Sequence, residues 1–207
     1  MSQASRGRRA TAVLAVLVLA SAAVLAGRSA LSSGPPAADG PEAGFARDMS
    51  THHAQAVRMS FVVRDRTRDA PVRLLAYDII NTQSAQIGMM TAWLDAWRLP
   101  KTDPAGPMRW MKGHGGHGAA TATTTMPGMA SPEELKELER ASGRPAEVRF
   151  LTLMTRHHRA GVTMAEAVLA RTGEPRVRAL ARTMVDGQRS EIDLMNRMLG
   201  ERGARAA

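Results

Sequence analysis

The stretch that decides the fold is FARDMSTHHAQAVRMS, residues 45–60, because the chain contains it twice. It aligns without a gap with FLTLMTRHHRAGVTMA, residues 150–165. The offset persists along the chain, and 17 of the 50 positions in residues 45–94 are identical to their partners in residues 150–199. Chance would give only a few identities, so we interpret the two segments as an internal duplication.

Each copy has the pattern of a helical hairpin. In the first, apolar residues and His52 recur every three or four positions, which places them on one helix face, with Arg47, Thr51 and Arg58 opposite. A break at residues 69–71 precedes a second apolar stripe, and the second copy repeats this order around residues 173–175. Two hairpins that each expose an apolar stripe can bury the stripes only against each other. The sequence therefore predicts an all-α four-helix bundle with pseudo-twofold symmetry over residues 41–200.

Residues 95–149 connect the two copies. Ser131, Pro132 and Glu134 form an N-terminal capping pattern, so we expect a short connecting helix that ends at Gly143. The preceding stretch is rich in Gly, Thr and Ala, which predicts a mobile loop that the core does not need.

The amino terminus resembles an export signal. Three arginines precede an apolar run over residues 10–27, and a breaker-rich linker follows at residues 31–40. Residues 1–30 are therefore predicted to be a signal peptide or, if uncleaved, an N-terminal membrane anchor. The bundle would then lie outside the cytoplasm, in the envelope or the extracellular space, and residues 201–207 would form a short tail. The net charge of +9 is scattered and accompanied by few aromatic residues, so nucleic acid is not an expected partner.

The chain has no cysteine and 14 methionines, so the thioether is its only soft metal ligand. Doubled histidines in a methionine context occur at the same place in both copies, which favours a metal site over core histidines that are merely hydrogen-bonded. We predict as metal ligands Met49, His52, His53 and Met59, with their copies Met154, His157, His158 and Met164.

Further candidates lie in the connection and on the second helices. His114 and His117, flanked by Met108 and Met111, form a glycine-rich tract that could capture metal or could be an incidental loop. Met126 and Met129 could form a soft site or a plain hydrophobic turn. Gln83 and Gln188 could hydrogen-bond the ligand histidines, or could be buried glutamines satisfied by the backbone.

Several catalytic classes lack their residues. A carboxylate-bridged di-iron site needs Glu-x-x-His pairs, and a zinc protease needs His-Glu-x-x-His; the sequence contains neither. We therefore predict a non-catalytic protein that buffers, scavenges or chaperones copper, preferably Cu(I), or silver. The alternative is a structural or protein-interaction bundle that carries no metal.

The strings DMSTHHAQAVRMS, FLTLMTRHHRAGVTMAEAV, MPGMASPEELKEL and QRSEIDLMNRML resemble the domain of unknown function 305 family. The resemblance covers about residues 41–200 and implies an exported ferritin-like bundle. It also implies copper or silver binding through the two His-His motifs and a place among envelope metal-handling proteins. One departure is Gln86, which stands where the family pattern and the second copy have a glutamate, here Glu191.

Overall fold

The computed structural model describes residues 34–111 and 126–206, in which the elements are helical. They are α2 (Pro41–Arg66), α3 (Ala70–Ala96), the 3-10 helix η1 (Arg109–Met111), α4 (Pro132–Arg140), α5 (Gly143–Leu169) and α6 (Pro175–Glu201). The chain divides into a unit of residues 1–36 and a unit of residues 37–207, and the second unit holds all of these elements. No helix of the described residues is long and apolar enough to cross a membrane, and the apolar run at residues 10–27 lies outside them.

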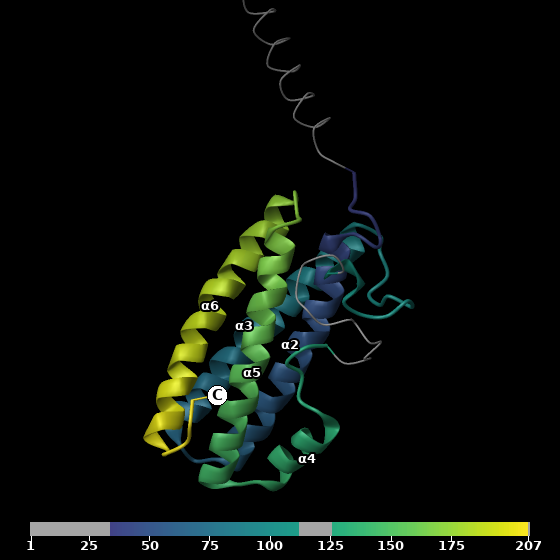
Figure 1. Cartoon of the computed structure of the whole chain (residues 1–207). Coiled ribbons are helices and arrows are strands. Elements are labelled where there is room, and N and C mark those ends of the chain that lie inside the picture. Colours follow the sequence, from purple (N-terminus) through teal and green to yellow (C-terminus); the bar gives the residue numbers. More distant parts are fainter. Residues whose placement is uncertain (1–33, 112–125, 207) are drawn as a thin grey trace, which may run out of the picture. The chain divides into compact units, whose positions relative to one another are not determined.

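The four long helices form two hairpins that meet through their first helices. Helix α2 packs along α3, α5 packs along α6, and the α2–α5 contact joins the pairs (Figure 1). Helix α4 lies against α2 and α5 near the end of the bundle where α5 begins. The predicted all-α bundle of two duplicated hairpins is therefore confirmed.

Matching caps fix the two hairpin turns. The Asp69 side chain accepts from the backbone N–H of Val72 at the start of α3, and Glu174 accepts from that of Arg176 at the start of α6. In each turn a threonine hydroxyl, that of Thr67 or Thr172, accepts from the N–H two residues later at 3.0 Å. These side chains satisfy N–H groups that a helix start leaves unpaired.

The connection between the two copies, residues 95–149, differs from the prediction where its short helix ends. Ser131 and Glu134 form the expected capping box, but α4 ends at Arg140. Gly143 is instead the first residue of α5, where its φ of +57° lets the chain reverse between the two helices. Helix α5 therefore begins seven residues before Phe150.

The prediction that Arg47 lies on the polar face is wrong, because its side chain is buried. Arg47 Nε donates to the Pro100 carbonyl at 2.7 Å, and Nη1 donates to the Ala38 carbonyl at 2.6 Å. The chain on either side of the hairpin folds over α2 and supplies these acceptors, which an isolated helix pattern does not show.

The core consists of two apolar clusters, and pseudosymmetric residues fall in opposite clusters. Phe45, Met49 and Met90 lie in one, whereas their copies lie in the other. A twofold axis through the bundle relates the two clusters, because the copy of a residue in one cluster lies in the other. Methionines at equivalent places thus flank the middle of the bundle from both sides.

A buried charge network closes one end of the bundle. Arg202, 8% exposed, pairs with Glu147 at 2.8 Å and with Asp69 at 2.9 Å, and it also donates to the Met198 carbonyl. It thereby joins the end of α6 to the start of α5 and to the first hairpin turn.

We expect Arg202→Ala to lower the free energy of unfolding by about 3 kcal/mol, because it leaves the Glu147 carboxylate buried without its cation. Urea unfolding monitored by circular dichroism measures this loss. The control is Arg189→Ala, which breaks an exposed pair with Glu166 and should cost no more than about 1 kcal/mol. Equal losses in the two variants would contradict the assignment.

Candidate metal centre

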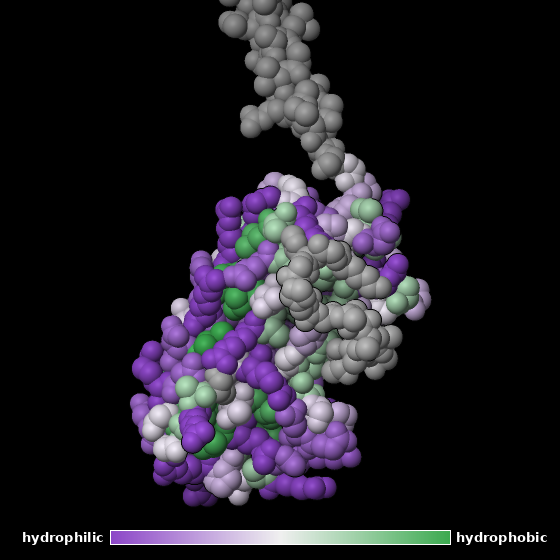
Figure 2. Space-filling view, viewed as in Figure 1, coloured by the Kyte–Doolittle hydropathy of each residue, from purple (hydrophilic) through white to green (hydrophobic). Residues whose placement is uncertain are grey.

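Helices α2 and α5 bring the two doubled histidines together in the middle of the bundle. Neighbouring residues on a helix diverge by about 100°, so each pair sends one ring toward the other hairpin and one toward its own partner helix. The rings of His52 and His157 stack across the α2–α5 contact, with centroids 3.6 Å apart and planes 27° apart. The duplication predicts this shared level. All four residues are at most 1% exposed. The surface over the bundle in Figure 2 is largely hydrophilic.

The outer histidines of the layer bond to the second helix of their own hairpin. His53 Nε2 donates to Gln86 Oε1 on α3 at 2.7 Å, and His158 Nε2 lies 2.6 Å from Glu191 Oε2 on α6. Both partners lie 33 residues after their histidine, so the two bonds are related by the duplication.

Four imidazole nitrogens of this layer are buried without a hydrogen-bond partner. They are Nδ1 and Nε2 of His52, Nδ1 of His53 and Nδ1 of His158. His157 donates through Nε2 to the backbone carbonyl of His52 at 3.0 Å. A neutral imidazole has one N–H and one lone pair, so these four nitrogens carry three free lone pairs, one on each ring. Buried polar atoms normally have partners, and a metal ion is a partner that such lone pairs can bind.

Burial keeps three of the rings neutral. Desolvation lowers the pKa of His52 and of His53 to about 3, and it lowers the pKa of His157 well below its usual value. Repulsion from neighbouring histidines adds to the lowering of the pKa in each case. A neutral ring keeps the lone pair that a metal ion requires, so these rings need lose no proton before binding.

Four buried methionines flank the histidine layer. Met49 and Met164 belong to the cluster on one side, and Met59 and Met154 belong to the cluster on the other. Met49 precedes His53 by four residues, and Met154 precedes His158 by four, so each pair shares a helix face. Each outer histidine thus has a thioether one turn away on its own helix.

Residues 126–130 form a strap across the two central helices. The Gln55 side chain on α2 makes two hydrogen bonds with the Ala130 backbone, at 2.7 and 2.9 Å. Gly128, with φ of +75°, lies so close to α5 that an added Cβ would be 2.5 Å from Ala160 Cβ and 3.4 Å from His157 Cα. The strap buries Met126 and leaves Met129 half-buried. These two candidate ligands therefore sit beside the histidine layer.

The connection places its other candidates differently from expectation. Met108 and Met111 are not part of an unpacked loop, because they pack against the first core cluster beside η1. The carboxylate of Asp48 holds this segment, accepting from the Met108 backbone N–H and from the Trp110 indole at 2.8 Å each. His114 and His117 lie outside the described residues.

The hydrogen-bond partners of the outer histidines are Gln86 and Glu191, one turn beyond the predicted Gln83 and Gln188. The latter two are buried, and their Oε1 atoms have no partner. The duplication gives both candidate pairs the same spacing in the two copies, so the sequence did not distinguish Gln86 and Glu191 from Gln83 and Gln188.

The described residues contain no group of three or more histidine, aspartate or glutamate side chains placed to hold one ion. A metal centre built from the four histidines would therefore also use methionine thioethers or require a ring to rotate.

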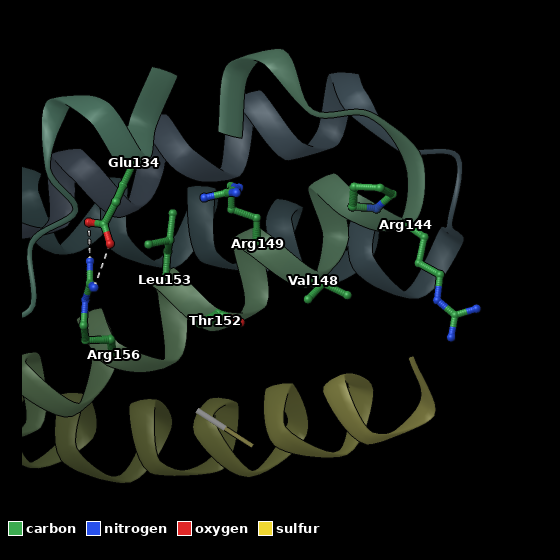
Figure 3. Close-up of a pocket in the computed structure, with 8 residues that line it drawn as sticks. Glu134, Arg144, Val148, Arg149, Thr152, Leu153 and Arg156 are labelled. Carbon is green, nitrogen blue, oxygen red and sulfur yellow. Dashed lines mark hydrogen bonds and ion pairs between the residues drawn. The ribbon is translucent and has the colours of Figure 1, made fainter. Parts of the chain in front are cut away.

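A groove of about 560 Å³ lies elsewhere, on the outer face of α5 beneath α4 (Figure 3). Its lining includes Glu134, ion-paired with Arg156, but no histidine or methionine, so it is separate from the layer.

Comparison with known proteins places the chain in a family. It is 51% identical to a DUF305 protein of Streptomyces coelicolor thought to be secreted, with a TM-score of 0.75, covering 83% of this chain and 99% of that one. A DUF305 fragment from Deinococcus radiodurans is 35% identical, with a TM-score of 0.64 and coverage of 78% and 96%. CopM in its Cu(I)-bound form is 21% identical, with a TM-score of 0.60 and coverage of 77% and 96%, and so shares the fold.

A curated relative, an uncharacterised protein of Acanthamoeba polyphaga mimivirus, is 38% identical over 53 residues, which are 26% of this chain and 35% of that protein. The chain thus spans about a third of the curated relative. The model of the domain of unknown function (DUF305) matches residues 42–199, which contain nearly the whole helical bundle. The chain therefore belongs to the DUF305 family.

Proposed function

We propose that this protein is an exported, non-catalytic metal-binding bundle that buffers, scavenges or delivers copper or silver ions. The observation that carries the proposal is the layer of four buried histidines, with four unpaired ring nitrogens and methionines on both sides. Imidazole and thioether together suit Cu(I), and imidazole also accepts Cu(II). CopM, which has the same fold, has been crystallised with Cu(I), Cu(II) and Ag bound.

The ring geometry favours one centre in each hairpin over a single shared ion. The stacked rings of His52 and His157 are nearly parallel, so their in-plane lone pairs do not converge on a common point without rotation. Within each pair the ring centroids are 6.5 Å apart for His52–His53 and 6.2 Å apart for His157–His158. Two imidazoles that share one ion have centroids roughly 5–6.5 Å apart, depending on the angle at the ion, given metal–nitrogen bonds of about 2.0–2.1 Å, so both separations are compatible with one ion in each hairpin. We assign Met49 to the first pair and Met154 to the second.

Export agrees with the composition of the amino terminus and with the description of the Streptomyces coelicolor relative. In the envelope the protein would exchange its ion with another metal-handling protein. If residues 1–30 are uncleaved, they would hold the bundle at the membrane.

The competing proposal is a structural or interaction bundle whose histidines only pack. The bond from His157 to the His52 carbonyl and the bonds to Gln86 and Glu191 are what that reading explains best. It leaves unexplained why neither ring nitrogen of His52 makes a well-formed hydrogen bond, although the ring faces the backbone carbonyl of Pro127.

Anaerobic titration of the purified protein with Cu(I), against a chromophoric Cu(I) chelator, separates the two proposals. We expect saturable binding tighter than micromolar. Binding no tighter than that of a variant lacking all six histidines would reject the metal proposal and leave the structural one.

Substituting His52 by leucine tests the number of centres. With one centre in each hairpin, the variant should bind about half as much Cu(I), whereas one shared ion would be lost altogether. The same change removes two buried, unpaired nitrogens, so we expect the free energy of unfolding of the apo protein to rise by about 1 kcal/mol. Metal analysis after desalting and urea unfolding measure the two effects.

The glycine-rich tract allows an independent test. Replacing His114 and His117 by alanine should lower the Cu(I) stoichiometry if the tract captures metal, with the melting temperature unchanged. The change is confined to these two residues because Met108, Trp110 and Met111 pack against the bundle. A stoichiometry equal to that of the unmodified protein would remove the tract from the candidate ligands.

A further inference from the structure

The two hairpins present their histidines to a metal in unequal ways, although the duplication makes them equivalent in position. His53 donates to the neutral amide of Gln86, whereas His158 faces the carboxylate of Glu191. The inner rings also differ, since His157 donates to the His52 carbonyl, whereas the ring nitrogens of His52 make no hydrogen bond to a side chain.

These bonds decide which nitrogen of each ring can bind an ion. A neutral imidazole that donates through Nε2 keeps its lone pair on Nδ1. Both rings of the second hairpin have acceptors at Nε2, so both are held with Nδ1 as the ligand atom. In the first hairpin this holds for His53, whereas the ring of His52 makes no hydrogen bond to another side chain; it stacks on His157 and faces the backbone carbonyl of Pro127.

A carboxylate partner also strengthens the ligand. When an ion binds at Nδ1, positive charge develops on the ring, and a carboxylate at Nε2–H stabilises it more than an amide does. The His158–Glu191 pair is fully shielded on the histidine side, and Glu191 is 24% exposed, so solvent screens the interaction only in part. The loss of such an outer partner typically weakens metal binding by about 10–100-fold.

We propose that the two hairpins hold metal centres of unequal strength, and that Glu191 makes the centre of the second hairpin the tighter one, which fills first. This inference rests on the proposed function and goes beyond it. Glu191 acts as a positioning residue, because it holds and polarises His158 without binding the ion. The first hairpin, with Gln86, is then the weaker centre that releases its ion more readily to an acceptor.

The experiment uses Ag(I), a soft ion that needs no reductant, at pH 8, where an ordinary histidine, with a pKa of about 6.5, is neutral. Three variants are compared with the unmodified protein: Glu191→Gln, Gln86→Glu and the double exchange of both. Glutamine at 191 can keep the hydrogen bond, as Gln86 does, so the single change removes only the charge. Competition titration gives the two affinities, and imidazole ¹⁵N resonances show which histidines bind first.

In the unmodified protein the resonances of His157 and His158 should shift before those of His52 and His53. Glu191→Gln should weaken the tighter centre about tenfold or more, Gln86→Glu should bring the weaker centre close to the tighter one, and the double exchange should reverse the order of filling. Melting temperatures of the apo variants distinguish a lost fold from a lost charge. Simultaneous filling of both pairs, or unchanged affinities in all three variants, would overturn this inference and leave the proposed function standing. Absence of any tight Ag(I) or Cu(I) binding in the unmodified protein would overturn both.

Discussion

Replacing His53 and His158 together by leucine should abolish tight Cu(I) and Ag(I) binding while leaving the bundle folded. Each substitution removes the ring whose Nδ1 is buried, unpaired and one helical turn from a methionine. Loss of a partner behind a ligand costs about 10–100-fold in affinity, so loss of a ligand from both centres should cost more than that. Competition with a Cu(I) chelator measures the loss.

Stability should respond in the opposite sense to binding. Leucine is similar in size to histidine, and it removes a buried nitrogen that has no partner. The groups left behind, Gln86 and Glu191, are only half-buried and can turn to solvent. A melting temperature equal to or above that of the unmodified protein would show that these histidines are kept for binding. A double variant that still binds Cu(I) at full stoichiometry would place the centres elsewhere.

Methionine substitutions provide the matched control. Met154→Leu removes the thioether beside His158 and conserves volume, so the core should be little affected. We expect weaker binding in the second hairpin alone. Met195→Leu changes a buried methionine of the same cluster that is not near the doubled histidines in sequence, and it should leave binding unchanged.

The fold was predictable from the sequence because duplication and periodicity are local signals. Residues 45–60 and 150–165 identify the repeat, and the Pro-containing breaks at 69–71 and 173–175 divide each copy into two helices. Residues at helical spacing on the second helix of each copy are buried in the structure, among them Met90, Met195 and both glutamines. The buried face of a helix follows from apolar residues spaced three or four positions apart and does not depend on the register between helices. The sequence alone could therefore predict it.

The details that escaped prediction all depend on tertiary register. Both Gln83 and Gln86 lie within reach of a face directed at α2, and only the packing of α3 on α2 selects Gln86 for His53. In the same way, the paired bonds of Gln55 with Ala130 and the burial of Arg47 require a connection to fold back over α2. No local pattern specifies where such a segment crosses a helix.

The same buried rings predict that the apo protein loses stability steeply in mild acid. In the unfolded chain His52, His53 and His157 bind protons with a pKa of about 6.5. In the folded protein the pKa of His52 and of His53 is about 3, and that of His157 is also lowered, so between these values the unfolded state binds more protons. Their contribution to stability is therefore complete above about pH 7 and decreases as the pH falls toward 3.

Three such groups give a slope of at most about 4 kcal/mol per pH unit, which is large against the roughly 5–15 kcal/mol that stabilises a typical domain. Asp48 acts in the opposite direction, because burial raises its pKa and its protonation favours the folded state, but only in the more acidic part of the range. When the apo protein is unfolded by urea at a series of pH values from 7.5 to 4.5, the urea concentration at the midpoint should decrease once the pH is below 6.5. Without urea, the apo protein should unfold between about pH 5 and 4. In the variant with leucine at positions 52 and 53, the slope of unfolding free energy against pH should be about a third of this.

A bound ion occupies the lone pairs that protons would take. The Cu(I)-loaded protein should therefore keep its midpoint urea concentration to lower pH than the apo protein, and it should release the ion where it unfolds. A flat midpoint between pH 7 and 5 would mean that water reaches the rings, and the layer would then be less enclosed than its burial indicates.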